Sequence, residues 1–331
     1  MNEHRAQALA ALEALEIRSS TSFAWYGAAR SPLTPAAAGA MDADLAREYL
    51  LYHLQQELYD SFYCRGGPVA TPRRPPHVKP MGATAFAELL AASNRGQGTL
   101  QPGWLIRGEG EGQLVIERGG LSLWVAPEQT VAGTQPGTVA LLLPSELRKA
   151  SPGFYVALGQ RTLDEAPEER IVRIYWHLTS AAAPRLIDRL TSSLNAAAIP
   201  FQLKVIDDPD RYDRCDAGVL YAPRGAFAAL APHVRETHTA LAGELREGVP
   251  AFTKRLGRGL GLAEDPGDGQ SFGMHRALLL AQAAVRAHER GQEDAETRVG
   301  VLGEVFREHG LDLDTPYLGH GSEDQYEIAP A

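Results

Sequence analysis

Cysteine is scarce in this sequence. Only Cys64 and Cys215 occur among its 331 residues, and they do not form a CxxC pair. A disulfide framework needs several cysteines at regular spacings, and a cysteine-built zinc site needs close pairs. Both are therefore excluded, and we expect neither a metal nor another cofactor.

Long hydrophobic runs are also missing. The two longest, Val139–Leu143 and Ala277–Ala281, are far shorter than the roughly 20 apolar residues of a membrane-spanning helix. The first 17 residues carry charged side chains among alanines and leucines, which is typical of an amphipathic helix and not of a signal peptide. We expect a soluble, cytoplasmic protein with no membrane partner.

Positive charge is in short supply. The chain has 32 Lys and Arg against 41 Asp and Glu, a net charge of −9. A nucleic-acid partner is excluded, because binding to nucleic acid needs a surplus of cations. An acidic substrate would need a local basic pocket. Lysine is the rarest cation, so a titratable amine has four candidates, namely Lys79, Lys149, Lys204 and Lys254.

The length allows about two domains or one large one. We predict an α+β fold with a mainly helical N-terminal region at 1–100 and an α+β region at 101–331; the alternative is that both belong to one continuous domain. Residues 1–62 show near-helical spacing of apolar residues, Leu15 and Ile17 included. Short apolar runs at 103–143 alternate with glycine-rich turns, which indicates an antiparallel meander. Its free strand edges could take a peptide, or the N-terminal helices could cover it.

The segment from Ile171 to Ile206 predicts a β-α-β unit. Residues 171–178 are typical of a strand, Pro184–Ala197 of a helix and Pro200–Ile206 of a second strand, parallel to the first. Residues 217–221 are expected to join this sheet, and 250–270 to form a glycine-rich loop. Because side chains alternate along a strand, we expect one helix-covered apolar face and one uncovered face that carries Arg173, Tyr175, His177, Gln202 and Lys204.

This polar face has two interpretations. Lone surface Lys and His side chains are usually just solvated. Gathered on one face, they could instead supply a neutral amine as base, an imidazole as acid and an arginine to hold an anion. Such a set suits the elimination of phosphate from a phosphorylated residue, without a metal.

Two further stretches could bind an anion. Residues 211–216 place Arg211 and Arg214 before Tyr221, although the same charged turn could hold internal Asp–Arg pairs. Residues 270–276 open a helix with His275 and Arg276 in its first turn, where backbone N–H groups favour anions, although a simple capped helix start is the alternative.

Metal-site and hydrolase motifs are incomplete. His233 and His238 lack the HExxH spacing, residues 264–268 lack the full calcium-loop pattern, and no GxSxG elbow occurs.

Five runs resemble the HopA-type effector family, which includes bacterial type III effectors and HopA-like lyases of ribosomal-peptide gene clusters. These runs are Ser151–Tyr155 (SPGFY), Ile171–Thr179 (IVRIYWHLT), Ile199–Tyr221 (IPFQLKVIDDPDRYDRCDAGVLY), Val249–Pro266 (VPAFTKRLGRGLGLAEDP) and Ser271–Arg276 (SFGMHR). In class V lanthipeptide and thioamitide pathways, such a lyase is thought to act with a separate kinase-like phosphotransferase. The resemblance implies a phosphorylated precursor peptide, with leader and core, as substrate, and dehydroalanine or dehydrobutyrine as product.

A more distant similarity to phosphothreonine lyases implies particular roles. It makes His177 the acid and Lys204 the base, and it places Arg214 and Tyr221 among the phosphate-binding residues. The sequence departs from those lyases at Tyr175, where a basic residue is expected, so Arg173 or Arg276 is a candidate substitute. The predicted phosphate-binding set is Arg173, Arg211, Arg214, Tyr221, Lys254, His275 and Arg276.

Three functions stay open. The first is a lyase acting on phosphoserine or phosphothreonine in a peptide. The second is a non-catalytic HopA-type effector that binds a host or partner protein. The third is an accessory subunit that presents a leader peptide to a kinase.

Overall fold

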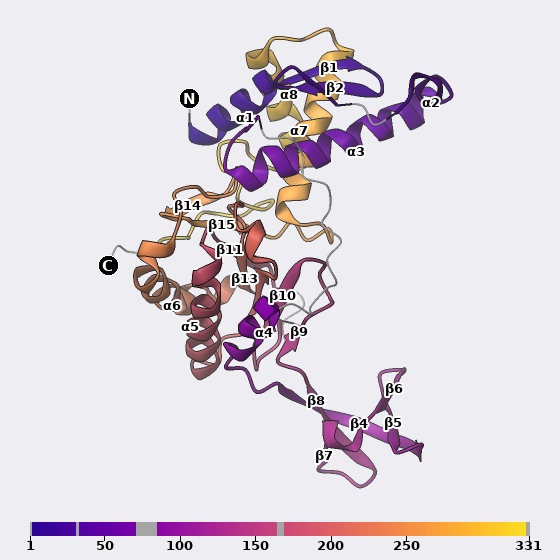
Figure 1. Cartoon of the computed structure of the whole chain (residues 1–331), viewed down its shortest axis with the longest axis vertical. Coiled ribbons are helices and arrows are strands. Elements are labelled where there is room, and N and C mark those ends of the chain that lie inside the picture. Colours follow the sequence, from indigo (N-terminus) through magenta and orange to yellow (C-terminus); the bar gives the residue numbers. More distant parts are fainter. Residues whose placement is uncertain (1, 31–32, 71–84, 164–168, 329–331) are drawn as a thin grey trace.

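The computed structural model describes residues 2–30, 33–70, 85–163 and 169–328. Figure 1 shows three parts along the longest axis: the N-terminal elements with two C-terminal helices, a central sheet with helices, and a small projecting sheet. The α+β class predicted from the sequence is confirmed.

The sequence predicts that residues 1–62 are helical, but the structure contains strands as well as helices in this part. Helix α1 (Glu3–Ala14) ends at Leu15, where the hairpin β1 (Leu15–Ser19) and β2 (Ser22–Trp25) begins, followed by β3 (Ala28–Arg30). Leu15 and Ile17 are buried with Glu16 exposed between them. This alternation has the period of a strand, and it overrides the weaker helical spacing. The prediction of a helix over these residues is therefore wrong.

Three helices follow. They are α2 (Pro35–Gly39), α3 (Ala43–Ser61) and α4 (Ala85–Ala92), with a short 3-10 turn η1 (Tyr63–Arg65) after α3. The side chain of Asp42 caps α3 by accepting from the N–H of Leu45.

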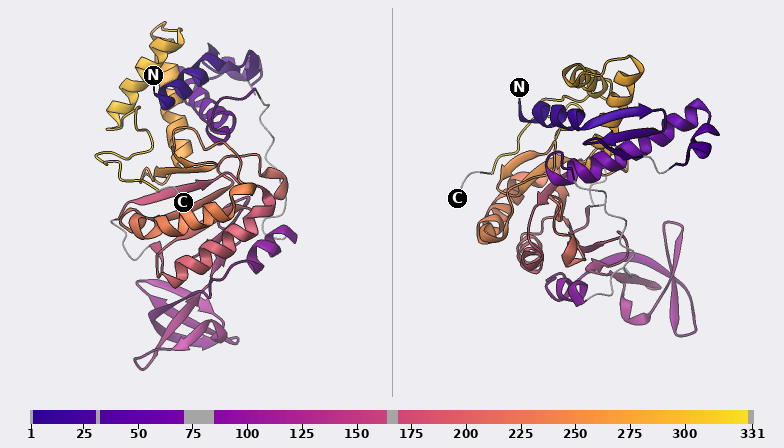
Figure 2. Two further views of the ribbon diagram at one scale, coloured as in Figure 1. Left: turned by 90° about the vertical axis from the view of Figure 1, so that its left-hand side faces the viewer. Right: turned by 45° about the horizontal axis from the view of Figure 1, so that its top comes forward.

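The meander predicted at 103–143 is present as a five-stranded antiparallel sheet in the order β6-β5-β4-β8-β7. Its strands are β4 (Thr99–Gly110), β5 (Gln113–Arg118), β6 (Leu121–Val125), β7 (Thr130–Ala132) and β8 (Thr138–Leu143). Gly119 and Gly120 form the turn between β5 and β6 with positive φ angles, which glycine adopts without strain. Helices α1, α2 and α3 lie at the opposite end of the molecule and do not cover this sheet (Figure 2).

The central sheet has seven antiparallel strands in the order β14-β15-β11-β13-β12-β10-β9. Its strands are β9 (Glu146–Leu147), β10 (Phe154–Leu158), β11 (Ile171–Trp176), β12 (Gln202–Ile206), β13 (Gly218–Pro223), β14 (Lys254–Gly257) and β15 (Leu260–Glu264).

The β-α-β prediction is correct in direction but not in adjacency. Strands β11 and β12 both pair antiparallel with β13, so they run parallel to each other with β13 between them. The crossover helix is α5 (Ala183–Ala196). Residues 250–270, expected to form a loop, instead contain the hairpin β14–β15, whose turn includes Gly259 at a φ of +60°.

Helices cover both faces of the central sheet. Helix α5 and helix α6 (Phe227–Ala240) lie on one face (Figure 2), where Gly218 approaches Leu186 of α5. On the other face, the ring of Tyr63 meets the ring of Tyr175 edge-on at 6.4 Å between centroids. The face predicted to be uncovered is therefore covered, because the aromatic residues that end α3 pack against it.

Two long helices and an irregular tail complete the chain. These helices are α7 (Phe272–Glu289), which Ser271 caps as expected, and α8 (Ala295–Glu308). One hydrophobic cluster joins residues of α1, α3, the central sheet, α7 and α8, whereas the meander has a separate small core around Trp104 and Ile116. No helix within the described ranges is long and apolar enough to cross a membrane.

Candidate functional site

The registers of β11, β13 and β12 bring the predicted base and acid to one face. Tyr175 and Lys204 both pair with Val219 of β13, so their side chains point to the same side of the sheet. His177 follows Tyr175 by two residues, just past the end of β11, and shares that side. Strands β11 and β12 are separated by β13 and therefore lie about 10 Å apart.

The next row on this face adds a cation and a phenol. Arg173 and Gln202 both pair with Tyr221 of β13. The Arg173 guanidinium lies 5.2 Å from the centre of the Tyr221 ring and donates from Nε to Asp265 at 2.7 Å. Arg173 is thus held between an aromatic ring and a carboxylate.

Lys204 is half-buried beside an aromatic ring. Its Nζ lies 4.0 Å from the centre of the Phe154 ring. Nothing in the described part of the chain accepts a hydrogen bond from this amine. Burial lowers the pKa of Lys204, and the nearby Arg173 and Arg214 lower it further, against the opposing effect of Asp216. The environment favours a neutral amine, which is the form that can accept a proton.

His177 is held by one ring nitrogen. Its Nδ1 lies 3.0 Å from the backbone oxygen of Gly248, whereas Nε2 is buried and has no hydrogen-bond partner among the described residues. A Cβ at position 248 would lie 3.5 Å from Nδ1 and 3.1 Å from Sγ of Cys215, so glycine lets this backbone come close. Burial lowers the pKa of His177, and the hydrogen bond to Gly248 opposes that effect.

Arg214 is occupied by the carboxylate of Asp216. Its Nε donates to Oδ1 at 2.8 Å and its Nη2 to Oδ2 at 2.7 Å. Nη2 also donates to the hydroxyl of Tyr59 at 2.9 Å. Burial alone would lower the pKa of Arg214, but Asp216 outweighs it and the pKa is raised. The internal Asp–Arg pair considered for this turn is therefore observed.

Two of the other predicted phosphate-binding residues hold the C-terminal tail. Arg276 is only 1% exposed and donates to the backbone oxygens of Pro316 and Leu318. Lys254 forms an ion pair with Asp324 at 2.6 Å. Both side chains therefore have partners within the protein.

His275 and Arg211 contact residues outside the C-terminal tail. His275 lies beside Arg276, with its Nδ1 2.7 Å from Nη1 of that arginine. Burial, with Arg276, lowers the pKa of His275 to about 4. Arg211 lies against Gly153, in the turn η5 (Pro209–Arg211) after β12. None of these four side chains lies in the rows that contain Lys204 and Tyr175.

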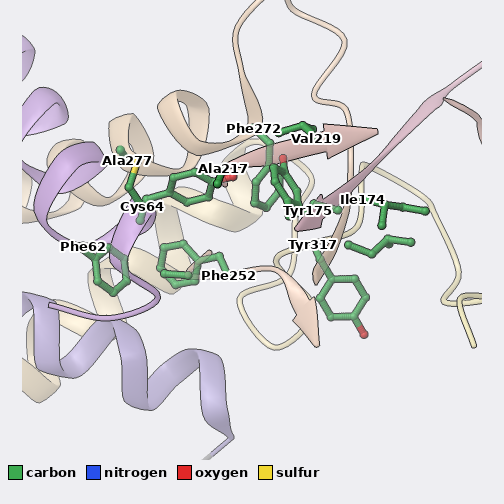
Figure 3. Packing of buried hydrophobic residues seen from close by; sticks show 14 of the residues in the cluster. Phe62, Cys64, Ile174, Tyr175, Ala217, Val219, Phe252, Phe272, Ala277 and Tyr317 are labelled. Atoms are coloured by element: carbon green, nitrogen blue, oxygen red, sulfur yellow. The ribbon is translucent and has the colours of Figure 1, made fainter. Parts of the chain in front are cut away.

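Several residues of this face are not predicted from the sequence. Tyr59, Tyr63 and Arg65 come from α3 and η1, more than 100 residues before β11, whose face they cover. Arg65 donates from Nη1 to the backbone oxygen of Asp213 at 2.7 Å and contributes to lowering the pKa of His177. Figure 3 shows Tyr175 and Phe272 close together below Val219, in the packing that closes this face. The only sequence signal for Asp216 was its spacing of two from Arg214.

The described residues contain no group of three or more His, Cys, Asp or Glu side chains that could hold a metal ion. The face instead combines an amine, an imidazole and two arginines with buried phenols. Such a set can bind an anion and move protons beside it.

Fold and site together define an α+β protein whose antiparallel sheet carries a lysine and a histidine on one face. Residues 145–318 match the HopA1 effector protein family, which is more than half of the chain. The chain therefore belongs to this family, and the family resemblance drawn from the sequence is confirmed.

Two solved structures that are similar to this chain are effector proteins of Pseudomonas syringae. The one from pathovar tomato strain DC3000 shares 18% identity over 81% of this chain and 99% of its own, with a TM-score of 0.45. The one from pathovar syringae strain 61 shares 18% identity over 82% of this chain and 98% of its own, with a TM-score of 0.44. A comparison with curated proteins finds no match.

Proposed function

We propose that this protein is a phosphoserine or phosphothreonine lyase that acts on a phosphorylated ribosomal precursor peptide. Lys204 takes the α-proton of the phosphorylated residue, the Cβ–O bond breaks as the Cα–Cβ double bond forms, and His177 protonates the departing phosphate oxygen. The products are dehydroalanine or dehydrobutyrine in the peptide and free phosphate. Atoms and electrons balance without an oxidant or metal.

The observation that carries this proposal is the shared face of Lys204 and His177. Both present a side-chain nitrogen that has no hydrogen-bond partner within the described ranges. Their strands lie about 10 Å apart, with β13 between them. A proton acceptor and a proton donor on opposite sides of one residue are what a β-elimination needs.

The charges around this face suit a phosphate. Arg173 and Arg214 are near enough to Lys204 to lower its pKa, so three cations gather in a chain of net charge −9. A bound dianion would raise the pKa of His177 and favour its acid form. Lys204, in contrast, must be neutral to act, and burial supports that state.

A kinase-like phosphotransferase is the partner that this reaction requires. Serine and threonine hydroxyls are poor leaving groups, so a phosphoryl-transfer reaction must precede the elimination. We include such a partner in the proposal, together with the leader and core of the precursor peptide.

The test is elimination from a synthetic phosphopeptide. The purified chain is incubated with the phosphorylated core of a precursor, and mass spectrometry follows the loss of phosphoric acid. Trapping of the new double bond by a thiol shows that the phosphate leaves by elimination and not by hydrolysis. Hydrolysis, or no reaction on any phosphoserine or phosphothreonine peptide, overturns the proposal.

A binding role is the second candidate, and the outward face of the meander favours it. Five large apolar side chains on this face are exposed, namely Leu100, Leu105, Trp124, Val131 and Leu142. Their cross-strand partners, such as Leu100 with Leu142, confirm that they share one side. Exposed apolar patches commonly mark interaction sites. Leader-peptide affinity that falls in Trp124→Ser, with unchanged elimination from a short leaderless phosphopeptide, would assign leader binding to this face.

A further inference from the structure

Asp216 lies near enough to Lys204 and His177 for its charge to act on both, although neither family resemblance nor motif assigns it a role. It precedes β13 and its side chain is buried, with 5% of the residue exposed. A buried carboxylate needs compensating partners. Those partners explain what the residue does.

The contacts of Asp216 are specific. Its two oxygens accept from Nε and Nη2 of Arg214 in a fork, at 2.8 and 2.7 Å. The hydroxyl of Tyr59 donates to Oδ2 at 3.4 Å while it accepts from Nη2 of the same arginine. The thiol of Cys64 lies 3.9 Å from Oδ2. Carboxylate, guanidinium and phenol thus form one closed unit.

This unit leaves one edge of the guanidinium available. Nη1 of Arg214 has no hydrogen-bond partner among the residues that the structure describes. A guanidinium offers donors on more than one edge, and phosphate is a preferred acceptor for them. A carboxylate on the Nε–Nη2 edge therefore fixes the plane of the arginine and leaves Nη1 for another anion.

The charged and titratable groups around Asp216 come from every element that packs against it. The central sheet contributes Lys204 from β12, Arg173 and Tyr175 from β11, Tyr221 from β13, and His177 just beyond the end of β11. The loop that contains Asp216 contributes Arg214 and Cys215. Helix α3 and the turn η1 contribute Tyr59, Asp60, Tyr63, Cys64 and Arg65. The cations in this set outnumber the carboxylates.

We propose that Asp216 is a positioning residue for the elimination, an inference that rests on the proposed function. Its carboxylate fixes Arg214 so that Nη1 can bind the phosphate. It also supplies the counter-charge that the buried Arg214 needs before the substrate arrives.

The test is the pH dependence of kcat/KM for Asp216→Asn on a phosphopeptide. This profile reports groups of the free enzyme. Asp216 raises the pKa of both Lys204 and His177, so removing its charge lowers both. Both limbs of the profile then move to lower pH, by about one unit. A purely structural role would lower the rate at every pH without moving the limbs.

One control variant and two possible results separate this inference from the proposed function. Asp188→Asn, in the surface ion pair with Arg95, should leave the profile in place. A folded Asp216→Asn protein with an unshifted profile overturns this inference but leaves the proposed function standing. A wild-type chain that eliminates nothing overturns both, and this is known before any variant is made.

If Asp216→Asn does not fold, Tyr59→Phe replaces it as the test. This change removes one hydroxyl that joins the carboxylate to the guanidinium and keeps the charge. KM for the phosphopeptide should rise about fivefold, the effect of one lost hydrogen bond, with the pH profile unchanged. An unchanged KM overturns the inference.

Discussion

Lys204 and Tyr175 lie on either side of Val219 in one row of the sheet, because β12 and β11 both pair with β13 at that residue. This register brings a half-buried amine into the same row as a buried phenol, with His177 two residues after Tyr175, just past the end of β11. The hydroxyl of Tyr175 is buried, and the side chain of Tyr63 lies next to it.

Lys204→Ala should abolish elimination. The neutral amine is the proposed base, and no other lysine lies in these rows. We expect kcat to fall by at least about 100-fold, the usual contribution of a general base, when phosphate release from a phosphopeptide is measured. The matched control is Lys254→Ala, which removes an amine that is paired with Asp324. Comparable losses in both variants would count against a specific role for Lys204.

His177→Asn should lower kcat more than it raises KM. Asparagine keeps a hydrogen-bond donor for the oxygen of Gly248 but cannot give up a proton to the leaving phosphate. A phosphopeptide whose leaving oxygen is replaced by sulfur needs less protonation and should be affected less by the substitution. Equal losses on both substrates would contradict the role of acid. His288→Asn, whose partner is Glu293, is the control.

The protein should lose stability as the pH falls from about 6.5 towards 4. Burial and Arg276 lower the pKa of His275 to about 4 in the folded chain, against an ordinary value of 6.5. The unfolded chain therefore binds the proton first, and the stability present above pH 6.5 is lost as the pH drops through this window. The contribution is on the order of 2 kcal/mol.

Urea unfolding of wild type and His275→Gln at pH 7.5 and 4.5 measures this effect. The variant should lose less stability between the two values than the wild type does. Equal losses of unfolding free energy in the wild type and the variant would show that other titrating groups cause the pH dependence.

Glu264→Gln should destabilise the protein by about 3 kcal/mol, because it leaves Arg224 without its buried carboxylate. Glu264 pairs with Arg224 at 3.1 Å and accepts from Ser322, Tyr326 and the N–H of Gly319, so it joins β15 to the tail. Limited proteolysis should then cut residues 311–328 faster than in the wild type. Glu308→Gln, an exposed partner of Arg286, should cost less than about 1 kcal/mol. A tail that stays equally protected in both variants would contradict this role.

The alternation of polar and apolar residues along 171–178 and 200–206 was enough to put His177 and Lys204 on one side of a sheet, since side chains on a strand have a period of two. The pattern of residues 184–197 predicted the helix between them, and five sequence runs indicated the family to which the chain belongs. These features depend on neighbours in the sequence, which the sequence shows directly.

What covers this face was decided by the tertiary structure alone. Strand β13 lies between β11 and β12, and Tyr59, Tyr63 and Arg65 arrive from over 100 residues away. Arg276 and Lys254, which the sequence predicts as phosphate-binding residues, contact the C-terminal tail. Such long-range partners leave no periodic trace in the sequence, because which buried cation meets which carboxylate or carbonyl is set by packing across the whole chain.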